Sequence, residues 1–259
     1  MAKASQPLWT VVGKKLVMAV TGLLLCLFLV GHLAGNTLLL AGANNQFRVF
    51  NAYANFLDAL PILPIVEILL LAIFLMHAYD GLVLTLENRR ARAQGYELKV
   101  WARAKSPNSR KSASSSTMMW TGTVILLFVA LHVYHFKYNH PLGAAPPDSV
   151  AAGSIGSDMA IANQPASTAP QAARDLASLV VWEFHKPAIV ALYVFAMVVL
   201  GIHLFHAVSS SLQSLGIGDA KWGNAIIWFG RAFTIVIAGG LLLLPIWTYF
   251  CTTVPGGSQ

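Results

Sequence analysis

The sequence predicts an all-α integral membrane protein, a bundle of five transmembrane helices forming one domain over residues 1–259. Of these residues 56% are hydrophobic and only 10% are charged, and the mean hydropathy is +0.63. Because soluble domains carry about 25% charged residues, most of this chain is expected to be solvated by lipid. Five mostly apolar stretches reach the length of about 20 residues that a helix needs to cross the hydrocarbon core. They are residues 16–40, 63–86, 118–136, 187–212 and 225–250.

The first apolar stretch follows Lys14 and Lys15 and therefore has the flanks of a signal peptide. Its apolar run is about 25 residues, however, whereas the apolar region of a signal peptide spans 7–15. It also contains the polar residues His32 and Asn36. We therefore expect it to be a helix of the mature protein.

The basic residues predict the orientation of the bundle. Twelve of the 17 Lys and Arg residues lie in the N-terminal segment and in the second and fourth connections. Only four lie on the opposite side: Arg48, Lys137, Arg174 and Lys186. By the positive-inside rule, the N-terminus is expected in the cytoplasm, and five spans then leave the C-terminus outside. The net charge of +7 is thus attributed to membrane topology rather than to nucleic-acid binding.

The third connection, residues 138–181, is rich in Ala, Pro, Ser and Gly, which predicts a loosely ordered outer loop. Its last part, residues 172–182, is expected to form an interfacial helix. His140 and His185 fall in this region and are expected to be surface histidines. Cys26 and Cys251 belong to no CxxC or CxxCH motif, so a disulfide framework and covalent haem attachment are not expected.

Four of the eight histidines lie inside four different predicted helices, at two depths. At about 1.5 Å per residue, His32 and His132 fall in the outer half of the membrane, about 15 Å from the level of His77 and His203 in the inner half. Ionisable residues at such depths are costly and are functional candidates. Neutral imidazoles from facing helices are a usual means of holding haem iron in a bundle. The pattern predicts two haem b groups with two histidine ligands each, which carry electrons because no coordination position is left open.

Four further polar residues are candidate alternative ligands or contacts to a propionate or quinone: His135, His206, Asn36 and Arg231. His135 shares a helix face with His132, and His206 shares one with His203, so the choice within each cluster stays open. Glu67 in the second helix is a candidate for quinone contact or proton relay, and a buried structural carboxyl is the alternative. No residue of this chain is predicted to be catalytic.

Short motifs around the histidines form a recognisable pattern. The main pieces are Met18-Ala19-Val20-Thr21-Gly22-Leu23, Gly31-His32-Leu33-Ala34-Gly35-Asn36, His77-Ala78 with Gly81, Trp120-Thr121-Gly122, His132 with His135-Phe136, His203-Leu204-Phe205-His206 and Gln213-Ser214-Leu215-Gly216. With these motifs the chain resembles the cytochrome b558 membrane subunits of succinate dehydrogenase and fumarate reductase, the single-subunit type with two haems and five helices. Ala207 departs from the pattern, since the family usually has Gly there.

The resemblance implies that His32 and His132 hold the distal haem, and His77 and His203 the proximal one. It also implies a multi-pass location in the bacterial cytoplasmic membrane, a flavoprotein and an iron–sulfur subunit on the cytoplasmic face, and a membrane quinone, with menaquinone favoured. The chain has no dinucleotide fingerprint, P-loop or cysteine cluster, so flavin and iron–sulfur sites must lie on partners. Two alternatives remain: the di-haem anchor of a hydrogenase or formate dehydrogenase, and a non-redox membrane protein that uses buried histidines.

Overall fold

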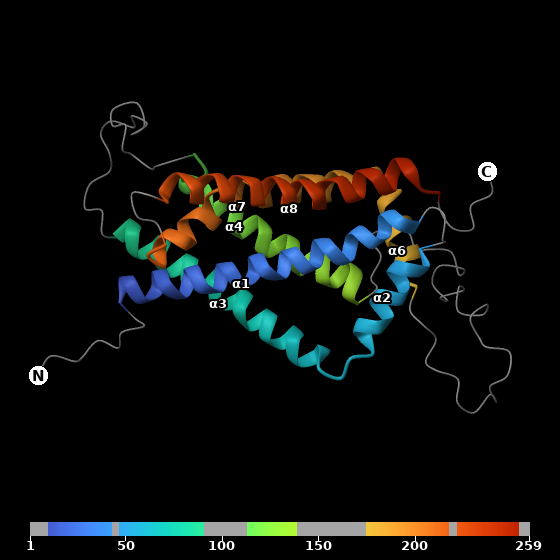
Figure 1. Ribbon diagram of the computed structural model, residues 1–259, viewed down its shortest axis with the longest axis horizontal. Coiled ribbons are helices and arrows are strands. Elements are labelled where there is room, and N and C mark those ends of the chain that lie inside the picture. The colour runs from blue at the N-terminus through green and yellow to red at the C-terminus, as the bar shows by residue number, and fades with distance from the viewer. Residues whose placement is uncertain (1–9, 43–46, 91–112, 139–174, 218–221, 254–259) are drawn as a thin grey trace, which may run out of the picture. The chain divides into compact units, whose positions relative to one another are not determined.

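The computed structural model describes residues 10–42, 47–90, 113–138, 175–217 and 222–253, and all regular secondary structure within these ranges is helical (Figure 1). The elements are α1 (Val11–Thr37), η2 (Leu38–Gly42), α2 (Arg48–Asp58), α3 (Leu63–Arg90), α4 (Ala113–His132), η4 (Val133–Lys137), α6 (Leu176–Phe184), α7 (Pro187–Ser214) and α8 (Gly223–Cys251). The predicted all-α fold is confirmed.

Five helical stretches are long and apolar enough to cross a membrane: Val11–Ala41, Leu63–Arg90, Thr117–Lys137, Pro187–Ser214 and Gly223–Cys251. Each contains a predicted span or matches it within a few residues, so the five spans are confirmed. The orientation of the bundle stays a prediction. The predicted helix at 172–182 is matched in part by α6, and most of the predicted outer loop, His140 included, lies outside the described residues.

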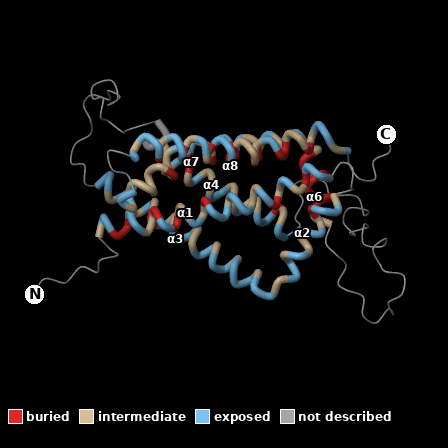
Figure 2. The backbone as a smooth tube through the Cα atoms, in the orientation of Figure 1, coloured by how far each residue is buried: buried red, intermediate tan, exposed pale blue. Residues whose placement is uncertain are grey.

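Large apolar side chains cover the exposed faces of the long helices, as the pale blue stretches of α3 illustrate in Figure 2. On α3, Ile65, Ile68 and Leu71 are 57–69% exposed. Contiguous apolar surface of this kind is rare on soluble monomers, and a long helix that is apolar all round belongs in a membrane. The chain is therefore a multi-pass membrane protein whose outer faces are solvated by lipid.

The chain forms two compact units, and each long helix contributes to both. The first, called the His77 unit, comprises Met1–Val30, Val66–Leu126 and Val198–Gly239. The second, called the His32 unit, comprises Gly31–Ile65, Leu127–Met197 and Gly240–Gln259. Each unit contains one of the two predicted histidine pairs, so each pair is described within its own unit.

In the His77 unit, small residues allow helices to approach closely, as is common in membranes. A Cβ atom at Gly230 of α8 would lie 3.3 Å from the backbone nitrogen of Ser209 on α7. The ammonium group of Lys14 on α1 also pairs with the carboxylate of Glu87 on α3. These contacts bring segments that are far apart in sequence into one unit.

The His32 unit is built around an apolar cluster of six buried residues: Leu39, Phe50, Ala177, Val180, Phe184 and Tyr193. Three of them come from α6. This short helix is therefore a buried structural element of its unit.

Helices α2 and α6 are joined by the side chain of Asn51. Its amide nitrogen donates to Asp175 at 2.7 Å, and its amide oxygen accepts from the backbone N–H of Ala177 at 2.9 Å. Asp175 also caps α6 by accepting from the backbone N–H of Ser178. Helix α2 was not predicted, because an amphipathic segment of 11 residues is too short and too polar to register as a span.

Candidate haem-ligand pairs

Two pairs of histidine rings lie close together, one in each unit, with ring planes inclined by 86° and 71°. In the His32 unit, the ring centres of His32 on α1 and His132 on α4 lie 5.7 Å apart. In the His77 unit, those of His77 on α3 and His203 on α7 lie 6.5 Å apart. A metal–imidazole bond of about 2.0–2.1 Å on each side places two ring centres roughly 6 Å apart across a metal. Both spacings therefore fit two axial ligands of one iron.

In the His77 unit, both histidines make the same contact to a threonine. The Nδ1 atom of His77 lies 3.1 Å from the Thr21 hydroxyl, and that of His203 lies 3.1 Å from the Thr121 hydroxyl. Each hydroxyl has a single proton, which it donates to a backbone carbonyl one turn earlier in its own helix. With its proton used in this way, the hydroxyl oxygen is left to accept the Nδ1–H of the histidine.

This arrangement favours the same tautomer in both rings. With the proton on Nδ1, the lone pair of each neutral ring lies on Nε2, where it is available to a metal. Histidines that ligate metals almost always donate their other N–H to such a partner, which orients the ring and raises its basicity. Residues of α1 and α4 thus leave the Nε2 lone pairs of His77 and His203 available to a metal.

A glycine follows each of these threonines and makes room for the same ring. A Cβ atom at Gly22 would lie 3.2 Å from Cε1 of His77, and one at Gly122 would lie 3.6 Å from Cε1 of His203. The sequence contains this Thr-Gly dipeptide on both helices, but sequence reasoning assigned neither copy a role. The repeated dipeptide was the signal that would have found the partners of His77 and His203.

The His32 unit supports its pair differently. Tyr193 on α7 places its hydroxyl 3.4 Å from Nδ1 of His132 and 3.0 Å from Nδ1 of His135. The η4 segment is a π-helical turn, shown by the backbone bond from Tyr138 to Val133. This widened turn brings both histidines to one hydroxyl, and π-turns often occur at functional sites.

The other candidate residues lie around the pairs. The ring against His32 is that of His132, whereas His135 is fully buried against Tyr193 and Glu183. The ring against His77 is that of His203, and His206 lies one turn further along α7. The ligand assignment itself stays a prediction.

The candidates for propionate or quinone contact are placed as follows. Asn36 donates its amide to the backbone oxygen of His32 at 2.8 Å. The guanidinium of Arg231 lies 5.5 Å from the ring centre of Phe205 and 4.9 Å from that of Trp228. Glu67 is half-buried on α3. Arg231 is thus held by cation–π contacts, and its Nε atom has no hydrogen-bond partner among the described residues.

His185 was expected to be a surface histidine. The residue is half-buried, and its Nδ1 and Nε2 atoms lie 2.7 and 2.9 Å from the carbonyl oxygens of Val181 and Thr252. It therefore ties the end of α6 to the end of α8 within the His32 unit. Sequence reasoning placed His185 in a loop and could not anticipate either contact.

Three charged residues, Lys14, Asp80 and Glu87, lie in the His77 unit, and the pairing of Lys14 with Glu87 was not predicted. Lys14 and Asp80 are only 8% and 6% exposed, and Lys14 pairs with Glu87. The Oδ2 atom of Asp80 has no hydrogen-bond partner within the described ranges. Lys14 was attributed to membrane topology, but its burial and its carboxylate partner show that it also joins α1 to α3.

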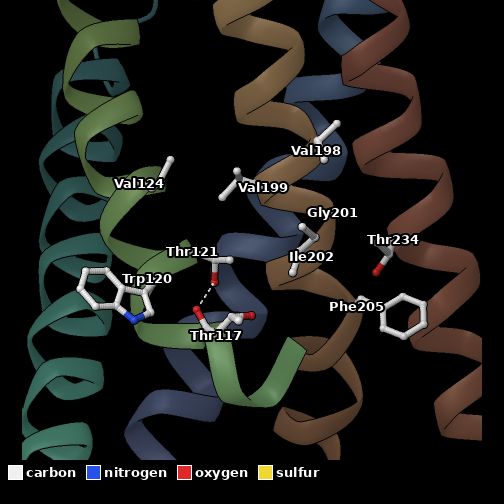
Figure 3. Close-up of a pocket in the computed structure, with 10 residues that line it drawn as sticks. All are labelled: Thr117, Trp120, Thr121, Val124, Val198, Val199, Gly201, Ile202, Phe205 and Thr234. Atoms are coloured by element: carbon white, nitrogen blue, oxygen red, sulfur yellow. Dashed lines mark hydrogen bonds between the residues drawn. The ribbon is translucent and has the colours of Figure 1, made fainter. Parts of the chain in front are cut away.

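An apolar groove of about 770 Å³ lies between α4, α7 and α8 in the His77 unit (Figure 3). Trp120 and Phe205 form part of its wall, together with Thr121, the partner of His203. Its lining offers few polar groups beyond threonine hydroxyls. A groove of this composition suits an acyl or isoprenoid chain better than a polar ligand.

No family model, curated protein or solved structure matches this chain. The described residues also contain no cluster of three or more His, Cys, Asp or Glu side chains able to hold a metal ion. A macrocycle-bound iron requires only two axial ligands from the protein, which is what each histidine pair offers.

Proposed function

We propose that this chain is the di-haem cytochrome b membrane anchor of a succinate:quinone oxidoreductase in a bacterial cytoplasmic membrane. It would pass electrons from an iron–sulfur subunit through two b haems to a membrane quinone, with menaquinone favoured. The succinate chemistry would take place on a flavoprotein partner. The observation that carries this proposal is the pair of neighbouring imidazoles found in each of the two units.

The surroundings of the histidines support haem rather than a proton path. When bound, each haem b supplies a one-electron redox centre. The threonines that contact His77 and His203 accept the Nδ1 protons and keep both Nε2 lone pairs free. A proton path would instead need side chains that exchange protons, whereas these hydroxyls already donate to helix carbonyls. This favours ligation over the non-redox alternative.

The succinate dehydrogenase assignment rests on the motifs. Thr21-Gly22 and Thr121-Gly122 belong to the matched pieces, and both dipeptides contact a proposed ligand of the proximal haem. His203 is the first residue of the matched stretch His203-Leu204-Phe205-His206 on the fourth predicted helix. Most of the pieces that carry the resemblance thus surround the histidines.

The first test is the optical spectrum of the purified protein after reduction with dithionite. A b-type α-band with two haems per chain is expected, and a preparation without haem would rule out a cytochrome. Identification of the co-purifying subunits then decides between complexes. A flavoprotein with succinate dehydrogenase activity supports the proposal, whereas a hydrogenase or formate dehydrogenase subunit contradicts it.

Ligand variants test the assignment within the proposed cytochrome. His77→Ala or His203→Ala should remove one haem and leave the haem of the other unit in place, whereas His32→Ala should do the reverse. His206→Ala is the matched control, because its ring lies one turn from His203, and it should retain both haems. Retention of both haems in His203→Ala would refute the assignment.

A further inference from the structure

A chain of polar contacts leads from the partly exposed Lys186 to His132 within the His32 unit. The Lys186 ammonium donates to Oε1 of Glu183 at 2.7 Å, and Oε2 of Glu183 lies 3.0 Å from Nε2 of His135. The Nδ1 atom of His135 lies 3.0 Å from the Tyr193 hydroxyl, which lies 3.4 Å from Nδ1 of His132. The side chains of Glu183 and His135 are both 0% exposed.

The chemistry of these groups gives the chain a direction. An ionised carboxylate is only an acceptor, so the ion pair with Glu183 favours a proton on Nε2 of His135, although the two atoms meet outside hydrogen-bond geometry. With the ring proton on Nε2 alone, Nδ1 accepts, and the Tyr193 hydroxyl donates to it. The phenolic oxygen is left to accept the Nδ1–H of His132, which places the His132 lone pair on Nε2.

Glu183 is held in the ionised form that this direction requires. Burial by itself disfavours the carboxylate, but the contacts from His135 and Lys186 outweigh burial and hold the pKa of Glu183 below its ordinary value of 4.5. Because it is fully buried, the carboxylate acts on its neighbours with little screening by water.

The two histidine pairs differ in the charge of the groups that support them. The threonine partners of His77 and His203 are neutral, and each donates its proton to its own helix. The partner of His132 is instead connected through His135 to a buried carboxylate. Polarisation along such a chain makes the His132 imidazole a stronger electron donor, which favours oxidised iron.

We propose that Glu183 is a positioning residue for the ligand His132. Acting through His135 and Tyr193, it keeps the His132 proton on Nδ1 and lowers the reduction potential of the haem held by His32 and His132. This inference rests on the proposed function, since it presupposes a haem at that pair.

The test is an optical redox titration of the purified complex that resolves the two haems. In Glu183→Gln, the reduced-to-oxidised ratio of the His32–His132 haem at its wild-type midpoint should rise about tenfold, which corresponds to about 59 mV for one electron. The haem held by His77 and His203 should keep its potential. Tyr193→Phe should produce a similar rise, because it removes only the hydroxyl that links the two histidines.

Non-additivity and a matched control make this test specific. Glu183→Gln combined with Tyr193→Phe should shift the potential no further than either change alone, because both break the same chain. Ser178→Ala removes another buried polar group from α6 and should leave both potentials unchanged.

The outcomes separate this inference from the function on which it rests. A wild-type protein without haem would refute the proposed function. A wild-type protein with two haems whose potentials stay unchanged in Glu183→Gln and Tyr193→Phe would overturn the inference alone. If Glu183→Gln does not fold, Tyr193→Phe decides by itself, since it preserves the packing of α7. Equal shifts in Ser178→Ala would also count against the proposed chain.

Discussion

Replacing Thr121 by Val tests whether the threonine hydroxyl prepares His203 for ligation. Valine has nearly the shape of threonine, so the change removes one oxygen atom and little else. That oxygen lies 3.1 Å from Nδ1 of His203, and Thr121 is only 8% exposed, so water cannot easily replace it. In Thr121→Val the Nδ1–H of His203 is left without an acceptor.

The structure sets the size of the expected effect. A buried donor without a partner costs about 1–3 kcal/mol. Because 1.4 kcal/mol corresponds to a factor of ten, binding of the haem at His77 and His203 should weaken by about 5–150-fold. Loss of the outer-shell partner of a metal ligand typically costs about 10–100-fold, which agrees with this range. The haem of the His32 unit should be unaffected.

Haem affinity is measured by transfer to an excess of an apoprotein that binds haem, followed in the reduced spectrum. Thr121→Ser keeps the hydroxyl and should behave as the wild type. Thr234→Val is the matched control, because Thr234 is also buried in the His77 unit but bonds to its own helix at Gly230. If Thr121→Val lost haem no faster than Thr234→Val, the hydroxyl would have no part in ligation.

Three further predictions concern packing and acid stability. Gly22→Ala should weaken haem binding in the His77 unit, because the new Cβ would lie 3.2 Å from Cε1 of His77. Gly122→Ala should be tolerated, because its Cβ would lie 3.6 Å from Cε1 of His203. Equal haem content in both variants would refute this prediction. Gly35→Ala should destabilise the His32 unit by about 1–3 kcal/mol in denaturant unfolding, since its Cβ would lie 2.6 Å from the Tyr53 ring, and an unchanged midpoint would contradict it. The lowered pKa of Glu183 stabilises the fold above its unfolded pKa, and this contribution is lost as the pH falls below 4.5 and through the folded pKa. Glu183→Gln should therefore show a weaker loss of stability in acid, and an identical acid transition would count against it.

The helices and the positions of the histidines along them could be predicted from the sequence alone. The mean hydropathy of a segment is set by its own residues. Five long apolar segments therefore predict five spans, whatever packs beside them. Helical rise then assigns each histidine a depth, and equal depth identified His32 with His132 and His77 with His203 as potential partners. The same local signals missed α2, which is short and amphipathic and gains its place by contact with η2 and α6.

Only the tertiary structure decided which side chains support each histidine. Thr21 lies 56 positions from His77 in the sequence, and Tyr193 lies 58 positions from His135, so neither contact follows from local spacing. The contacts depend on which faces of two helices meet. The π-helical turn of η4 changes the helix face on which His132 and His135 lie. Which of two neighbouring histidines meets its partner, and whether Glu183 contacts His135, thus depends on how each helix is rotated and packed. Hydropathy does not encode that rotation, because lipid solvates every apolar face alike.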